Sequence, residues 1–178
     1  MSKSKLATFF LGTGDRPSPR WMLVSWVGGF LGIFMIERIG RLLDLGDQVS
    51  LFLIGSFGAT AVLVYGAPKA PFSQPRNVIG GHCISALVGA SVFLVLGDQA
   101  MFACPLAVSL AIVAMQFTGT VHPPGGATAL IAVIGGSTIH QLGYWYVLCP
   151  VGLGASIMVG VAIVVNNLSG DPERKYPN

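Results

Sequence analysis

A long stretch of this chain carries no charged side chain: between Gln99 and Gly170 there is no aspartate, glutamate, lysine or arginine. Across the whole chain 53% of residues are hydrophobic and 10% are charged, whereas soluble domains contain about 25% charged residues. Such a stretch is too long for the core of a soluble protein, but it is natural for several consecutive membrane spans. The sequence therefore predicts an integral membrane protein embedded in a lipid bilayer.

Six apolar segments can be drawn along the chain, at residues 21–36, 50–66, 78–96, 99–118, 125–139 and 142–166. A straight helix needs about 20 residues to cross a bilayer, and the second and fifth segments look short. We therefore expect an all-α polytopic membrane protein with about six transmembrane or re-entrant helices, two of them short and broken. One domain would cover residues 21–166, between an N-terminal tail at 1–20 and a C-terminal tail at 167–178.

The basic residues predict the orientation of these helices. If both tails are cytoplasmic, Arg38 and Arg41 lie outside and the other basic side chains lie inside, as the positive-inside rule requires. The first 20 residues do not read as a signal peptide and are expected to form a cytoplasmic tail. The expected location is the plasma (inner) membrane of a bacterium or cyanobacterium. Aromatic residues near segment ends are expected at the headgroup level. These are Trp21, Trp26, Tyr144, Trp145 and Tyr146.

Short repeated sequences indicate a duplication. Gly-Ala-Thr-Ala occurs at 58–61 and 126–129, in the two short segments, and Gly-Ala-Ser follows at a nearly equal offset at 89–91 and 154–156. Each half, about 21–96 and 99–166, then holds three segments. Because three is odd, the second half enters the membrane in the opposite direction, which predicts a 3+3 inverted repeat as in many secondary transporters. Another match, Val-Ile-Gly-Gly, is out of register with this alignment. Short matches of this kind are common in membrane helices.

The two short helices predict a site for a small anion. If both begin near the membrane midplane and run in opposite directions, their N-termini face each other. Each helix start exposes unpaired N–H groups and about half a positive charge, so no buried cation is needed. Thr60 and Thr128 could add hydroxyls, or could instead bond a carbonyl one turn earlier. The predicted substrate-binding residues are Ser56, Gly58, Ala59, Thr60, His122, Gly125, Gly126, Ala127 and Thr128.

Two proline-containing segments predict a vestibule or gate. The segment 119–125 could reach inward and bring His122 toward the midplane, or could be an ordinary turn before a tilted helix. In the proline-rich segment 68–77, Arg76 could attract an anion or could simply set the topology, and the amide side chains are expected to hold the loop together. His82 and His122 could gate or relay a proton, or could bond a neighbouring helix. The predicted vestibule or gate residues are Gln74, Arg76, Asn77, His82, Pro123 and Pro124.

Several classes of function are disfavoured by what the apolar segments lack. They hold no paired carboxylates and no Ser/His/Asp arrangement, so we do not expect an enzyme, and a membrane enzyme that used the two histidines would lack a nucleophile. The absence of acids also disfavours cation carriers. Cys83, Cys104 and Cys149 are not spaced as metal ligands, so no metal site and no cofactor are predicted. No basic stripe suggests a nucleic-acid partner.

Four sequence blocks, at 55–61, 67–68, 74–82 and 121–130, resemble the HPP family of integral membrane proteins, which is named for the tripeptide His122-Pro123-Pro124. Members in chloroplasts and cyanobacteria are associated with nitrite transport, so the resemblance implies a transporter of nitrite or a similar small anion. Family descriptions commonly give four spans. If only four segments cross here, the second and fifth would be re-entrant.

The sequence as a whole predicts a membrane transporter of a small monovalent anion, with nitrite first, that binds at a midplane site and assembles as a homo-oligomer. Two alternatives stay open. One is a passive anion channel, and the other is a non-transporting scaffold or sensor whose glycine-rich segments only pack helices.

Overall fold

The computed structural model describes residues 16–42, 44, 55–97 and 99–178, and all regular secondary structure in this part of the chain is helical, without a strand. Four helices are long and apolar enough to cross a membrane. They are α2 (Pro19–Leu42), α4 (Pro75–Leu96), α5 (Ala100–Thr118) and a continuous stretch, Val147–Leu168, made of η3 (Val147–Gly152) and α8 (Leu153–Leu168). The prediction of an all-α polytopic membrane protein is confirmed.

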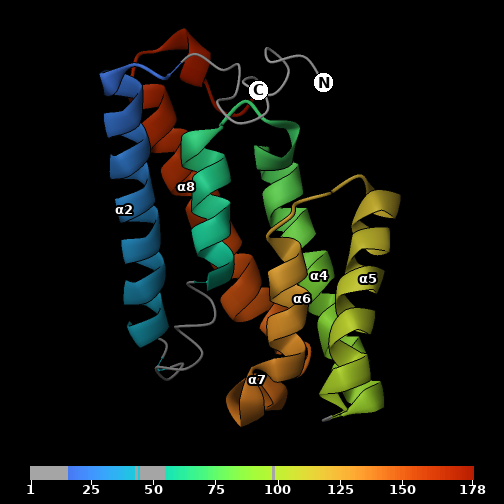
Figure 1. Ribbon diagram of the computed structural model, residues 1–178. Coiled ribbons are helices and arrows are strands. Elements are labelled where there is room, and N and C mark those ends of the chain that lie inside the picture. The colour runs from blue at the N-terminus through green and yellow to red at the C-terminus, as the bar shows by residue number, and fades with distance from the viewer. Residues whose placement is uncertain (1–15, 43, 45–54, 98) are drawn as a thin grey trace, which may run out of the picture.

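Two further apolar helices, Gly55–Gly66 and α6 (Gly125–Ile134), are too short to cross a bilayer. They are the second and fifth predicted segments, whose residues 50–54 lie outside the described part. In Figure 1 both helices begin inside the bundle and run in opposite directions, Gly55–Gly66 toward the end that holds the C-terminus and α6 away from it. The described part of the chain therefore combines four long helices with two short ones.

Several predicted boundaries are wrong by a few residues. The fifth segment does not continue to 139, because the chain turns at Gly136 (φ 73°) into α7 (Gly136–Leu142). The sixth does not begin at 142, because Gly143 (φ 52°) ends α7 and the long helical stretch starts at Val147. A positive φ suits glycine, which explains both breaks. The N-terminal tail is also slightly shorter than expected, since α2 begins at Pro19.

Helix α2 packs through a narrow stripe of its surface. Its buried residues, Gly28, Gly32, Ile36 and Gly40, recur every four positions and so share one face. This face lies against Tyr65: a Cβ atom added at Gly28 would be 2.6 Å from Tyr65 Cδ1. The Tyr65 hydroxyl in turn donates to the Met158 carbonyl at 3.2 Å and so joins the short helix to α8.

The C-terminal residues close the end of the Gly55–Gly66 helix. A helix end inside a protein needs partners for its last carbonyl groups. Asn166 Nδ2 donates to Val64 O at 3.0 Å, and Arg174 Nη2 donates to Tyr65 O at 2.6 Å. Arg174 lies in the short turn η4 (Pro172–Arg174) and is fully buried. Its burial lowers the pKa of the guanidinium from the usual value, and the Asp171 carboxylate opposes that shift.

Candidate functional site

The segment between α5 and α6 runs into the protein along α4, as Figure 1 shows. Two glycines of α4 make room for it. A Cβ atom at Gly80 would lie 2.8 Å from Thr120 Cγ2, and one at Gly81 would lie 2.5 Å from His122 Cβ. His122 is consequently fully buried, which agrees with the inward path considered for this segment rather than with an exposed turn. Non-helical backbone at such a depth is tolerated because it is buried in protein.

The first turns of the two short helices lie side by side. Ser56 Oγ is 2.7 Å from Thr128 Oγ1, and Thr60 Oγ1 is 3.0 Å from His122 Nε2. The residue pairs run in opposite order along the two segments, as expected for antiparallel neighbours. The helix starts thus overlap by about one turn, four residues, instead of facing each other end to end across a gap.

His82 of α4 joins the two repeated tetrapeptides. Its Nε2 lies 2.8 Å from Thr60 Oγ1 and its Nδ1 lies 2.7 Å from Thr128 Oγ1, so one imidazole bonds the equivalent threonines of both halves. The sequence placed His82 among the gate residues, whereas the structure places it at the centre of the predicted binding residues. We call this group the polar cluster: Ser56, Thr60, His82, His122 and Thr128, each at most 2% exposed.

The other predicted binding residues lie around the cluster in different ways. Ala59 and Ala127 are exposed, and Gly58 and Gly126 are half-buried. Gly125 is buried. The N–H groups at the start of α6 are paired with nearby carbonyls: Gly125 N–H donates to His122 O at 2.8 Å, and Gly126 N–H to Pro123 O at 3.1 Å. The polar groups gathered here are therefore hydroxyl and imidazole side chains rather than free N–H groups of α6.

The predicted vestibule residues hold loops in place. Gln74 Nε2 donates to Pro68 O, Asn77 Nδ2 to Val121 O and exposed Arg76 Nη2 to Thr118 O, each at 2.9 Å. Pro123 is exposed. Pro124 is buried, and its carbonyl lies 3.2 Å from Ser56 Oγ, farther than Thr128 Oγ1. The amide groups therefore hold the loops together, as expected, while Arg76 lies at the surface near the start of α4 and the end of α5.

Two contacts of the cluster were not predicted. The Phe72 carbonyl, in the turn η2 (Pro71–Ser73), lies 2.7 Å from His122 Nδ1. The Tyr146 hydroxyl donates to Thr128 O at 3.2 Å. Tyr146 was expected at the headgroup level but is fully buried. A backbone carbonyl has no sequence signal, and the cluster Tyr144-Trp145-Tyr146 gives no indication of which ring turns inward.

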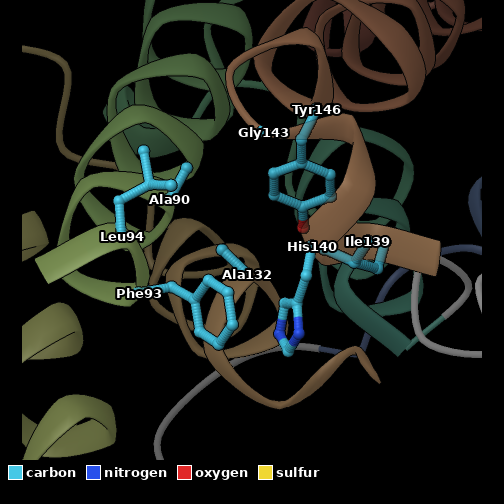
Figure 2. A pocket seen from close by; sticks show the side chains of 8 residues that line it. All are labelled: Ala90, Phe93, Leu94, Ala132, Ile139, His140, Gly143 and Tyr146. Atoms are coloured by element: carbon cyan, nitrogen blue, oxygen red, sulfur yellow. The ribbon is translucent and has the colours of Figure 1, made fainter. Parts of the chain in front are cut away.

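A small cavity lies beside the cluster, between α4, α6 and α7. Figure 2 shows its lining side chains, among them Phe93, His140 and Tyr146, and it has space for about one water molecule. The His140 ring stacks on Phe93 with ring centroids 3.5 Å apart, and its Nε2 donates to Val133 O at 3.0 Å. Because Tyr146 both lines this cavity and bonds Thr128, the cavity is next to the Thr128 side of the cluster.

Comparison with known proteins identifies relatives of this chain. The family model for the HPP transmembrane region matches residues 14–177. Two transmembrane proteins of Dictyostelium discoideum are similar: one is 44% identical over 86% of this chain, and the other is 46% identical over 94% of it. The chain covers 49% and 60% of the length of these two proteins. No solved structure matches the chain significantly.

Proposed function

Because the chain belongs to the HPP family of transmembrane proteins, we propose that it carries a small monovalent anion across a membrane, with nitrite as the first candidate. The observation that carries this proposal is the polar cluster, which lies where the first turns of two short helices overlap within a membrane bundle. Polar side chains buried at membrane depth are costly, and they commonly mark a substrate pathway.

The chemistry of the cluster supports an anion rather than a cation. It offers hydroxyl and imidazole N–H donors, and it contains no carboxylate that would attract a cation. It also contains no arginine or lysine. A buried guanidinium would hold an anion strongly, whereas partial charges bind it more weakly and allow release, as conduction requires.

The choice of nitrite as the first candidate anion rests on the resemblance described above. The similar Dictyostelium proteins are named only as transmembrane proteins, and the chain covers part of their length. They therefore support membrane location and leave the identity of the anion to experiment.

The packing of the cluster supports a carrier over a passive channel. Its five side chains are at most 2% exposed, so the anion must wait for the helices to move. An inverted repeat would provide such a motion. Two matching contacts support the inverted repeat. A Cβ atom at Gly89 would lie 2.5 Å from Ala129 O of α6, and one at Gly154 would lie 2.6 Å from Phe57 Cε2 of the first short helix. Each glycine thus approaches the short helix of the other half.

We also propose that both ends of the chain face the cytoplasm. Lys69, which pairs with Glu173, and Arg76 lie at the end of the bundle where α8 finishes, while Arg38 and Arg41 lie near the opposite end of α2. This distribution supports the orientation through the positive-inside rule. The relatives come from a eukaryote, so they give no support to a bacterial or cyanobacterial membrane in particular.

Purified protein in liposomes tests the proposal. At neutral pH, nitrite should enter these vesicles faster than it enters empty vesicles. The rate of entry should saturate with nitrite concentration, because a carrier has a limited number of sites. Nitrate, formate and chloride are measured in parallel. A rate that rises without saturation would instead indicate a channel. If none of the four anions crosses faster than in empty vesicles, the transport proposal is wrong and the scaffold alternative gains support.

A further inference from the structure

If both imidazoles are neutral and each side-chain contact within the polar cluster is a hydrogen bond, the donors can be assigned in a single order. A carbonyl only accepts, so His122 Nδ1 carries a hydrogen and donates to Phe72 O. The other nitrogen, His122 Nε2, must then accept, and the hydroxyl of Thr60 donates to it. Tautomers follow here from the hydrogen-bond network.

The same reasoning extends through the rest of the cluster. Thr60 has one hydroxyl hydrogen, and it points to His122 rather than to the more distant Ser56 carbonyl at 3.4 Å, so Thr60 Oγ1 accepts from His82 Nε2–H. His82 Nδ1 therefore accepts from the Thr128 hydroxyl, and Thr128 Oγ1 accepts from the Ser56 hydroxyl. All five donors point the same way. The order of donation is Ser56, Thr128, His82, Thr60, His122 and finally the Phe72 carbonyl.

The two ends of this chain of bonds lie toward opposite ends of the bundle. Ser56 precedes Thr60 by one turn in a helix that runs toward the end of the bundle where η2 and the C-terminal residues lie (Figure 1). The Phe72 carbonyl belongs to η2, and the adjacent Ser73 carbonyl accepts a bond from Tyr176 at 2.8 Å. On the other side, Tyr146 connects Thr128 with the cavity of Figure 2. The bonds are therefore directed along the bundle.

We propose that the polar cluster transfers protons, so that the anion crosses the membrane together with a proton. This inference rests on the proposed anion transport and adds the coupling ion to it. Hydroxyls and imidazoles both accept and donate, and an imidazole can accept at one nitrogen and release at the other.

The transfer is balanced in protons and moves no electrons. A proton that binds the Ser56 oxygen displaces the Ser56 hydrogen to Thr128, and each following group accepts one proton and releases another. The last release is from His122 Nδ1. Because the Phe72 carbonyl cannot pass a proton on, His122 must leave this carbonyl and give the proton to water or to the anion. Release is therefore tied to a movement of His122 relative to η2.

Few other titratable groups lie on the elements that pack around the two histidines. Tyr65 lies on the first short helix, Cys83 on α4, and Tyr146 and Cys149 at the η3 end of the long helical stretch. In the described part of the chain, Glu37 pairs with Arg41 and Glu173 pairs with Lys69, away from the cluster. The protons that move along the cluster are thus those of its own hydroxyls and imidazoles.

The experiment uses wild-type protein in liposomes with equal nitrite on both sides, a pH gradient that is alkaline inside, and potassium with valinomycin to hold the membrane potential at zero. Empty vesicles correct for nitrous acid that crosses the lipid by itself. Proton coupling predicts that nitrite accumulates inside above this correction. If nitrite crosses down its own gradient but the pH gradient drives no accumulation, proton coupling is wrong and anion transport stands.

A third result is that no anion crosses, in which case anion transport itself is wrong. The proton relay is then decided in vesicles without nitrite, by a trapped pH indicator under an imposed potassium diffusion potential. Protons that cross through the wild type but not through Thr60→Val would support the relay. Absence of any proton flux above empty vesicles would overturn it.

Variants at Thr60 separate proton transfer from shape. Thr60→Val keeps the volume and removes the hydroxyl between the two histidines, so pH-driven accumulation should fall by roughly tenfold or more, the range of a lost acid–base group. Thr60→Ser restores a hydroxyl and should stay within about twofold of the wild type. Thr138→Val makes the same substitution at an exposed position of α7 and is the matched control. Equal accumulation in Thr60→Val and Thr138→Val would contradict a relay through Thr60.

Discussion

Two neighbouring glycines of the Pro-Pro-Gly-Gly sequence have different surroundings. A Cβ atom at Gly125 would lie 2.6 Å from Ser85 Oγ and 3.0 Å from the Gly81 carbonyl, so α6 begins in direct contact with α4. At Gly126 the nearest atom, Val108 Cγ1, would be 3.8 Å away, which is an ordinary contact. Gly125 therefore sets the position of the helix start beside the polar cluster, whereas Gly126 has room for a larger side chain.

We predict that Gly125→Ala destabilises the protein by about 1–3 kcal/mol, because the added methyl group overpacks the α4–α6 contact. Gly126→Ala should change stability by less than about 1 kcal/mol, since it adds a methyl group without a close neighbour. The midpoint of thermal unfolding in detergent compares the two variants directly. Equal midpoints would show that the contact at Gly125 is not tight in solution.

At the scale of helices, α2 depends on two of its glycines to approach the first short helix. A Cβ atom at Gly32 would be 2.8 Å from Cζ of Tyr65, the residue whose hydroxyl bonds Met158 O. A Cβ atom at Gly29 would have no neighbour within 4 Å. The same helix therefore contains a tight glycine and an open glycine three residues apart. This contrast tests whether α2 packs through the stripe described above.

We expect Gly32→Ala to separate α2 from Tyr65 and to lower stability by about 1–3 kcal/mol, the usual cost of overpacking. Gly29→Ala should instead be neutral or stabilising by up to about 1 kcal/mol, because alanine favours a helix. Thermal unfolding in detergent provides the comparison. A larger loss for Gly29→Ala than for Gly32→Ala would mean that α2 presents a different face to the bundle.

At the scale of the whole molecule, the C-terminal residues join three helices at one end of the bundle. The Arg174 guanidinium donates to Tyr65 O, to Asn166 Oδ1 at 2.7 Å and to Ser25 Oγ at 3.1 Å. It also lies 4.4 Å from the centroid of the Trp21 ring. These contacts link the start of α2, the end of the first short helix and the end of α8. The same C-terminal segment contacts η2, because the Tyr176 hydroxyl donates to Ser73 O. The neighbouring Phe72 carbonyl of η2 accepts from His122.

Arg174→Ala should therefore lower stability by about 1–3 kcal/mol, because buried acceptors such as Asn166 Oδ1 lose their donor. Lys175→Ala is the control, since the adjacent Lys175 is exposed and its loss should have little effect. Thermal unfolding and the resistance of the C-terminal residues to protease provide two measurements. Similar behaviour of the two variants would show that the C-terminal segment does not hold the bundle together.

Much of the architecture follows from the sequence alone. The uncharged stretch, the lengths of the apolar segments and the separation of basic residues between the two ends of the bundle are local properties, and a bilayer converts them directly into helices of fixed length. The two short helices could be predicted for the same reason, as could the buried position of Thr60 and Thr128 near their starts.

Only the tertiary structure decided which groups meet. His82 lies between Thr60 and Thr128 because α4 packs against both short helices, and no spacing in the sequence encodes that rotation about the helix axis. The Phe72 carbonyl and the inward Tyr146 ring are likewise products of packing. Length and hydrophobicity act along the chain and can be read from it, whereas hydrogen-bond partners depend on the relative placement of distant segments.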